Sequence, residues 1–392
     1  MTGEGKWVFF IINLLQDVNI VRSLAHLTAR ETGARIGFLV TPAFLKRDRQ
    51  KVWQRELAVL ADDVSGDMNL YASPGEALDI LAGRAGLIFA AAESNLTAHE
   101  EVTSLFEAAP ASYVRVTLQH GFECVGFLQS REHVMSHGRN ISFSADVACG
   151  WFDAPSLTSM TASQRAKLYV SGPPTLLQRT ASPAQADRSG GGLVCENLHS
   201  VRLKASGDHK SSFMEIFFAF CRKLAERGEG VTLRPHPGGQ YVLKNKVELP
   251  HNVRINLRPL YEMDLRSYSW GISAPSTIVF DMILAGIPVG LWRDPSGVMD
   301  ASNYDGLTEI STLDDWLAFE RDVRLRPEMI VDRQDAFLAR LSMPIDPAEV
   351  YRRFARLIVA ALAMPSSYRD DYRSSSGRSL KLSGDVLVTA GA

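Results

Sequence analysis

Two histidines follow short apolar runs of the sequence, where the loop after a strand is expected. The first, His120, comes after the run 113–118 and before Gly121, which permits a sharp turn from strand to helix. An imidazole titrates near neutral pH, so His120 could take a proton from an acceptor hydroxyl as a general base. A loop histidine bonded only to the backbone is the alternative.

The second histidine, His236, stands between two prolines in the segment Arg234-Pro235-His236-Pro237. A proline restricts its own backbone and that of the residue before it, so little entropy is lost when His236 is held in place. Arg234 adds a guanidinium fork that matches phosphate oxygens. We expect this loop to bind a phosphate or a leaving group, and the alternative is a rigid turn.

A third candidate site opens the apolar helix expected over 278–286. Ser273, Ser276 and Thr277 place hydroxyl groups at its start, where the first backbone N–H groups lack intrahelical acceptors. Together these groups predict an anion site, against the alternative of simple N-capping by Ser273. Asp281 lies one turn further along, where it either meets a ribose hydroxyl or faces solvent.

The fourth loop follows the run 193–195 and carries Asn197, His199 and Arg202. These side chains could contact a donor diphosphate, and an ordinary polar loop is an equal alternative. The sequence contains no Walker loop, no Gly-x-Gly-x-x-Gly, no His-Glu-x-x-His and no nucleophile elbow. Their absence argues against P-loop NTPases, dinucleotide-binding dehydrogenases, zincins and serine hydrolases.

The elements that position these loops alternate between strand and helix patterns. Continuous apolar runs predict strands buried on both faces, and the stretches between them predict helices. The expected strands are 7–12, 36–40, 87–90, 113–117, 146–149, 167–170, 192–195, 231–233, 253–255, 270–272 and 289–292. Repeated β-α-β units form parallel sheets, and such sheets bind ligands at the carboxyl ends of their strands.

The segment 178–191 is rich in Ser, Ala, Gly and Pro and predicts a linker between two domains. We expect an acceptor-side Rossmann-like domain over 1–177 and a nucleotide-donor-binding Rossmann-like domain over 192–343. Within the second, Ser212 and Glu215 have the spacing of a capping box.

After the second domain, Asp346 and Pro347 predict the start of a helix over 344–363 that is free to cross back to the first domain. The segment 364–392 is expected to be a disordered tail. This organisation predicts the α/β fold class, with two Rossmann-like domains facing across a cleft as in the GT-B architecture. Any other two-domain α/β protein is the alternative.

The composition excludes several classes of protein. The 392 residues are 46% apolar and 22% charged, which excludes bulk disorder and fibrous repeats. A net charge of −2 provides no basic field for a nucleic-acid partner. Four widely separated cysteines favour a reducing compartment over a disulfide framework or a metal site. The apolar run 7–12 is too short for a signal peptide, so we expect a cytoplasmic protein.

The order of the motifs resembles that of a known superfamily. Gln119-His120-Gly121, then Arg234–Pro237, then Ser273–Thr277 with Asp281, and finally Gly286-Ile287-Pro288-Val289 resemble the CDP-glycerol glycerophosphotransferases of teichoic-acid synthesis. They also resemble the related capsule-polysaccharide transferases, which include β-Kdo transferases that use CMP-Kdo. The resemblance covers roughly residues 117–289, and it implies a GT-B enzyme that acts on cell-envelope glycans.

The resemblance also implies roles for single residues. The teichoic-type enzymes have one histidine in a His-Gly pair and one in a His-Pro pair, which implies an acceptor base at His120 and donor-phosphate stabilisation at His236. Ser276 and Thr277 match the paired hydroxyls at the pyrophosphate, although Ser273–Ser276 departs from the family's Asp-Tyr-Ser-Ser. The β-Kdo enzymes have an aspartate nucleophile where this chain has His120, so a double displacement would need another carboxylate, such as Glu123.

These features lead to an expected function with alternatives. We expect a transferase that moves a sugar from a CMP- or CDP-linked donor to a glycan or lipid-linked glycan acceptor by single displacement, with no bound cofactor and no metal. The alternatives are transfer of glycerol phosphate, an epimerase of the same architecture and a non-catalytic binding module. Lys204, Lys210 and the arginines at 369, 373 and 378 could contact the inner face of the cell membrane, and a solvated surface is the alternative.

Overall fold

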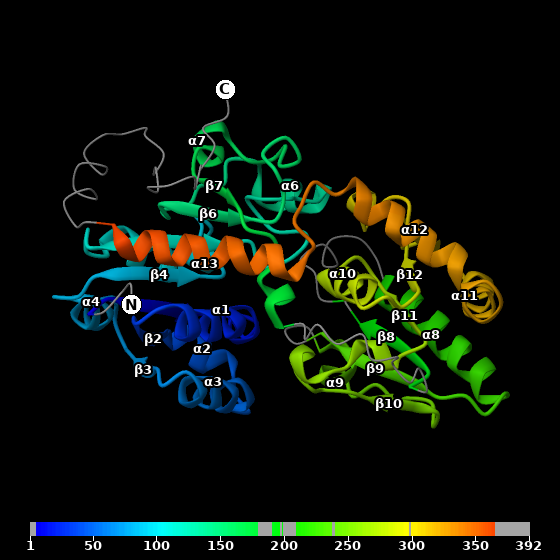
Figure 1. Ribbon diagram of the computed structural model, residues 1–392. Coiled ribbons are helices and arrows are strands. Elements are labelled where there is room, and N and C mark those ends of the chain that lie inside the picture. The colour runs from blue at the N-terminus through cyan, green and yellow to red at the C-terminus, as the bar shows by residue number, and fades with distance from the viewer. Residues whose placement is uncertain are drawn as a thin grey trace.

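The protein folds around two parallel β-sheets that lie side by side (Figure 1). The computed structural model describes residues 5–178, 190–196, 198, 209–236, 240–297 and 299–364. Asn197, His199, Arg202, most of the expected linker 178–191 and the tail beyond Met364 lie outside these residues. Within the described part of the chain, every strand pairing is parallel.

The first sheet has the strand order β3-β2-β1-β4-β5-β6-β7 among the described residues. Its strands are β1 (Trp7–Ile12), β2 (Arg35–Val40), β3 (Asp67–Leu70), β4 (Gly86–Ala90), β5 (Tyr113–Leu118), β6 (Val147–Gly150) and β7 (Leu168–Val170). The helices between them are α1 (Asp17–Glu31), α2 (Pro42–Arg47), α3 (Val52–Asp63), α4 (Pro74–Leu81), η1 (Thr97–His99), α5 (Glu100–Ala108), α6 (Arg131–His137), α7 (Ala162–Arg165) and η2 (Pro174–Gln178).

The second sheet has the order β10-β9-β8-β11-β12-β13, the doubly wound order of a dinucleotide-binding domain. Its strands are β8 (Gly192–Glu196), β9 (Val231–Pro235), β10 (Val253–Ile255), β11 (Trp270–Ser273), β12 (Val289–Trp292) and β13 (Thr308–Ile310). Its helices are α8 (His209–Ala225), α9 (Tyr241–Lys244), η4 (Leu260–Glu262), η5 (Leu265–Ser267), α10 (Thr277–Leu284), η6 (Ser302–Tyr304), α11 (Leu313–Leu325) and α12 (Pro327–Arg340).

Strand β1 shows why continuous apolar runs form these sheets. Alternate side chains of a strand point to opposite faces, so a strand covered on both sides must be apolar throughout. Val8, Phe10 and Ile12 pack on the face covered by α1 and α3, whereas Trp7 and Phe9 pack on the opposite face. All five are buried.

The last helix, α13 (Pro347–Ala363), leaves the second domain and lies along the first sheet (Figure 1, orange to red). Its apolar face, which includes Val350, Phe354 and Leu357, joins the core formed by α1 and the first sheet. Asp346 caps the helix by accepting hydrogen bonds from the backbone N–H groups of Ala348 (3.1 Å) and Glu349 (3.2 Å). The predicted cap is therefore confirmed.

The GT-B architecture expected from the sequence is the observed fold class, with differences in single elements. The strands β3 and β13 were not predicted, because both lie at sheet edges and lack an apolar run. The prediction of a helix start at Ser212 was wrong, since α8 already begins at His209. A Ser-x-x-Glu spacing inside a helix looks the same in sequence as one at its start. No helix in the described ranges is both long and apolar enough to cross a bilayer.

The cap of α13 provides a test of this packing. Replacing Asp346 by Ala removes both hydrogen bonds to the first turn, and we expect the free energy of unfolding to fall by about 1 kcal/mol. Asp346→Asn keeps an acceptor oxygen and should stay within a few tenths of a kcal/mol of the original chain. Urea unfolding followed by circular dichroism measures both. Equal losses in the two variants would contradict the capping role.

Candidate active site

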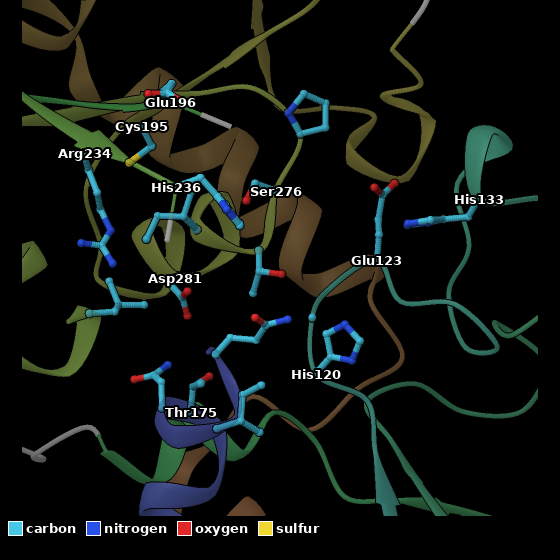
Figure 2. A pocket seen from close by; sticks show the side chains of 18 of the residues that line it. His120, Glu123, His133, Thr175, Cys195, Glu196, Arg234, His236, Ser276 and Asp281 are labelled. Carbon is cyan, nitrogen blue, oxygen red and sulfur yellow. The ribbon is translucent and has the colours of Figure 1, made fainter. Parts of the chain in front are cut away.

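A cavity of about 420 Å³ lies where the carboxyl ends of the two sheets face each other. Its walls come from loops that follow β1 and β5 in the first domain and β8, β9 and β11 in the second. His120, Glu123, Arg234, His236, Ser276 and Asp281 surround the cavity in Figure 2. Residues that lie more than a hundred positions apart in the chain thus share one site.

His120 is held at the cavity by two neighbours of its ring. Its Nδ1 lies 2.9 Å from the carbonyl oxygen of Ala91, the residue after β4, and 3.5 Å from Sγ of Cys124. A carbonyl can only accept, so Nδ1 carries the proton and Nε2 is the basic atom of the neutral ring. The alternative of a loop histidine bonded only to the backbone therefore holds for Nδ1. It does not hold for Nε2, which makes no hydrogen bond to the backbone of the described residues and can act as a base.

The charge of His120 depends on groups that surround it. Burial on its own would lower the pKa of the imidazole, but the Cys124 thiol, the Asp17 carboxyl and the hydrogen bond to Ala91 raise this pKa to about 9. Burial in turn raises the pKa of Asp17 to about 6. Asp17 accepts hydrogen bonds at Oδ2 from the backbone of Asn13 and Leu14, and its Oδ1 is buried with no hydrogen-bond partner in the described residues.

The loop that carries His120 continues directly into the second domain. Phe122 is fully buried against Phe280 and Tyr304 of the second domain, with ring centroids 5.8 and 5.0 Å away. Its backbone N–H donates to Oγ1 of Thr277 at 3.0 Å. A Cβ atom on Gly121 would lie 2.8 Å from the same oxygen, so this close approach of the two domains favours glycine.

Glu123 lies beside this loop and also reaches the second domain. Its Oε1 accepts a hydrogen bond of 2.7 Å from Asn303. Figure 2 shows the His133 ring pointing toward the Glu123 carboxylate. The Nδ1 atom of His133 lies 3.2 Å from Oγ of Ser130, within the capping box of α6. Glu123 is thus a carboxylate at the cavity that already has a structural partner.

The wall from the second domain carries the predicted phosphate residues. Arg234 is buried, and its Nη1 donates to the carbonyl of Arg258 at 2.6 Å. Burial lowers the pKa of this guanidinium, while the neighbouring Cys195 and Asp281 raise it. His236 follows at the end of β9, where its backbone N–H donates to the carbonyl of Glu196 at 3.1 Å.

The start of α10 also faces the cavity, but its hydroxyl groups are not equivalent. Ser276 is the N-cap residue, lines the cavity and makes no side-chain cap hydrogen bond. Thr277 lines the cavity as well, although its Oγ1 already accepts from Phe122. Ser273 does not reach the cavity: it is fully buried and donates to the carbonyl of Ala274 at 2.8 Å. Capping of α10 by Ser273 is therefore wrong.

Asp281 is buried and lines the cavity beside Arg234, so it does not face solvent. Sequence reasoning missed Asp17, and it took Glu196 only as part of a polar loop that could contact the donor; both act on the site indirectly. Glu196 accepts from the backbone N–H groups of Tyr241 (2.6 Å) and Val242 (3.0 Å), and so fixes the chain after the His236 loop. The signals for these roles were the position of Asp17 at the start of α1, after the loop that follows β1, and that of Glu196 at the end of β8.

The His, Cys, Asp and Glu side chains of the described residues form no group of three or more that could hold a metal ion. The expectation of a metal-independent enzyme stays a prediction.

Comparison with solved structures identifies the architecture. The wall teichoic acid polymerase TagF, in a structure with CDPG, is 12% identical, covers 91% of this chain and 88% of its own, and has a TM-score of 0.56. MnaA of S. aureus with UDP is 10% identical, with coverage of 96% and 100% and a TM-score of 0.57. This chain has the GT-B fold.

A further structure with this architecture is an epimerase. The UDP-GlcNAc 2-epimerase from Neisseria meningitidis, bound to UDP-GlcNAc, is 11% identical, with coverage of 91% and 99% and a TM-score of 0.54. No protein-family model matches the sequence, and a search of the curated proteins finds no match. At these identities the likeness shows the fold alone, and it supports neither transfer nor epimerisation over the other.

The hydrogen bond between the domains can be tested at Thr277. In Thr277→Val the buried N–H of Phe122 loses its acceptor, and we expect the free energy of unfolding to fall by about 1–3 kcal/mol. Thr277→Ser keeps the hydroxyl and should retain most of that stability. Denaturant unfolding of both variants makes the comparison. A valine variant as stable as the serine variant would show that this bond contributes little.

The charge of His120 can be tested without any substrate. We expect its imidazole to titrate near pH 9 and the Cys124→Ala variant to titrate at lower pH, because burial persists while the thiol is removed. The Cys221→Ala variant, in the core of the second domain, is the matched control and should leave the titration unchanged. NMR of the imidazole C–H protons across pH measures all three chains. Equal pKa values in the original chain and Cys124→Ala would rule out the thiol as the cause.

Proposed function

We propose that the chain is a glycosyltransferase of bacterial cell-envelope polysaccharide synthesis. It moves a sugar from a cytidine-nucleotide donor, such as CMP-Kdo, to a glycan acceptor. The observation that carries the proposal is the arrangement around the cavity: a histidine with a defined basic nitrogen on one wall, and a guanidinium, a second histidine and a helix start on the other. The choice of cytidine rests on the resemblance of the motifs.

In the proposed reaction the neutral form of His120 acts as base. The acceptor hydroxyl gives its proton to Nε2 while its oxygen forms a bond to the anomeric carbon. The bond between that carbon and the donor phosphate oxygen breaks, and its electron pair stays on the phosphate. Arg234, His236 and the first N–H groups of α10 stabilise this developing charge. Asp281 holds a ribose hydroxyl, and the proposal assigns no role to a metal ion.

Two features support single displacement over a double displacement. The position of the nucleophilic aspartate in the β-Kdo enzymes is occupied by His120. The carboxylate that could take its place, Glu123, already accepts a hydrogen bond from Asn303. Transfer of glycerol phosphate is the alternative that the resemblance of the motifs to the CDP-glycerol glycerophosphotransferases leaves open, and it would use the same two walls.

Nucleotide affinity is the first test. We expect isothermal calorimetry to show tighter binding of CMP or CDP than of UDP and GDP. The Ser276→Ala variant should bind the cytidine nucleotide about three- to tenfold more weakly, because one phosphate hydrogen bond is lost. Ser104→Ala, at an exposed position of α5, is the control and should bind like the original chain. Equal affinity for all four nucleotides would exclude a cytidine donor.

The role of His120 is tested by rate and pH. We expect His120→Ala to lose about 10²–10⁴-fold in transfer while it keeps its nucleotide affinity, and His26→Ala, exposed on α1, to transfer at the original rate. Only the deprotonated imidazole accepts a proton, so kcat/KM should rise with pH, reach half its limit near pH 9 and level off above it.

Mass spectrometry of the products distinguishes the remaining alternatives. A glycan extended by a sugar supports the proposal, and one extended by glycerol phosphate supports the alternative donor. Turnover of a nucleotide sugar with no acceptor added would indicate an epimerase. Unchanged turnover in His120→Ala would eliminate its role as base, and binding without any product would leave a non-catalytic module.

A further inference from the structure

One wall of the cavity is uncharged. It is formed by Gln16, Asn19 and Ile20 around the start of α1, Trp53 on α3 and Thr175 on η2. We call these five residues the neutral wall. It belongs to the first domain, as His120 does, and it faces the residues of the second domain that are proposed to hold the donor phosphate (Figure 2, where Thr175 is labelled).

The polar side chains of the neutral wall have unused hydrogen-bonding capacity. Gln16, Asn19 and Thr175 make no side-chain hydrogen bond to other residues in the described ranges, and Oδ1 of Asn19 is buried without a partner. Buried polar atoms without partners are uncommon in folded proteins, because each costs about 1–3 kcal/mol. A ligand that supplies hydroxyl groups would satisfy them.

Three carboxylates elsewhere around the cavity already accept hydrogen bonds. The Glu196 carboxylate accepts from Tyr241 and Val242, Glu123 accepts from Asn303, and Glu132 accepts from the backbone of Asp300. These carboxylates hold the walls of the cavity in place. The polar side chains of the neutral wall, by contrast, hold no other part of the described chain in place.

The neutral wall is also held in place before any ligand binds. Oγ of Ser23 on α1 donates to the carbonyl of Pro174 at 2.9 Å, and Nε2 of Gln178 donates to the carbonyl of Asn19 at 2.7 Å. These two bonds fasten η2 to α1. A ligand therefore binds here with little loss of main-chain entropy.

The chemistry of the neutral wall fits one class of ligand. Two amides and a hydroxyl can donate and accept hydrogen bonds, Trp53 offers a half-buried aromatic face with an indole N–H, and Ile20 adds apolar surface. A sugar ring combines hydroxyl groups at its edge with apolar C–H groups on its faces. A phosphate or carboxylate would find no cation among these five residues.

We propose that the neutral wall is the acceptor subsite and that it binds an uncharged sugar ring, a hexose or an N-acetylhexosamine, with one hydroxyl directed to Nε2 of His120. This proposal rests on the proposed function and narrows it. It makes the acceptor a neutral glycan end and excludes glycerol phosphate or an acidic sugar as the group that receives the transferred unit.

Binding of simple probes to the full chain tests the subsite. Saturation-transfer NMR is recorded with glucose, galactose, N-acetylglucosamine and glycerol 3-phosphate, in the presence of CMP. We expect a signal from at least one of the three sugars and none from glycerol 3-phosphate. The absence of a signal from all three sugars would overturn the proposal, as would a signal from glycerol 3-phosphate alone.

Nearly isosteric variants then locate the bound sugar. Thr175→Val and Gln16→Met remove hydrogen-bonding groups while keeping the volume of the side chain, and each should weaken sugar binding about three- to tenfold. Thr158→Val, at an exposed turn away from the cavity, is the matched control and should bind as the original chain does. Undiminished sugar binding in both wall variants would overturn the proposal.

Calorimetry with CMP separates this proposal from the proposed function. If CMP binds the wall variants normally and sugar binding falls, both proposals stand. If CMP binds and the wall variants hold the sugar as the original chain does, the subsite fails alone. If no cytidine nucleotide binds the original chain while the wall variants still lose the sugar in nucleotide-free samples, the donor assignment fails and the subsite stands.

Discussion

The geometry of the site depends on the insertion of Phe122 into the second domain. The ring packs between aromatic side chains of both domains, and the N–H of the same residue donates to Thr277 at the start of α10. His120 lies two residues before Phe122, so the contact that joins the domains also sets the position of the candidate base. The short loop from His120 to Phe122 therefore fixes the position of one wall of the cavity relative to the other. The domains also meet at a second contact. There the Tyr261 hydroxyl of the second domain donates to Glu56 of the first, and the Arg22 guanidinium lies 4.4 Å from the centre of the Tyr261 ring.

Much of the fold could be predicted from the sequence because its signals are local. A strand buried on both faces is apolar throughout, and the cap at Asp346 lies directly before the helix it starts. The same logic placed His120 and His236 at strand ends, and the structure brings both to one cavity. The edge strands β3 and β13 lack that signal. The partner of Thr277 and the burial of Ser273 could not be predicted, because both depend on residues that only the folded chain brings near.

The cavity is polarised between its two walls. The second domain supplies a buried guanidinium whose charge is costly to desolvate and is supported by Asp281. The first domain supplies the uncharged amides, hydroxyl and indole of the neutral wall, and separately His120 with the carboxylates of Glu123 and Glu132. A chain with 42 basic and 44 acidic residues can thus offer an anion a specific place without an overall basic surface. The cation placed for this purpose is the Arg234 guanidinium, which is held by its hydrogen bond to the backbone carbonyl of Arg258.

The return of α13 to the first sheet has a consequence for how the protein is made. Val350, Phe354, Leu357, Ile358, Ala361 and Leu362 belong to the same core as the first strands of the chain. Domains generally fold in order of synthesis, beginning at the N-terminus. Here the N-terminal domain lacks one wall of its core until residues beyond the whole second domain have left the ribosome. The N-terminal domain is therefore synthesised first but can complete its core only last. The second domain can form its own core before α13 has packed onto the first domain.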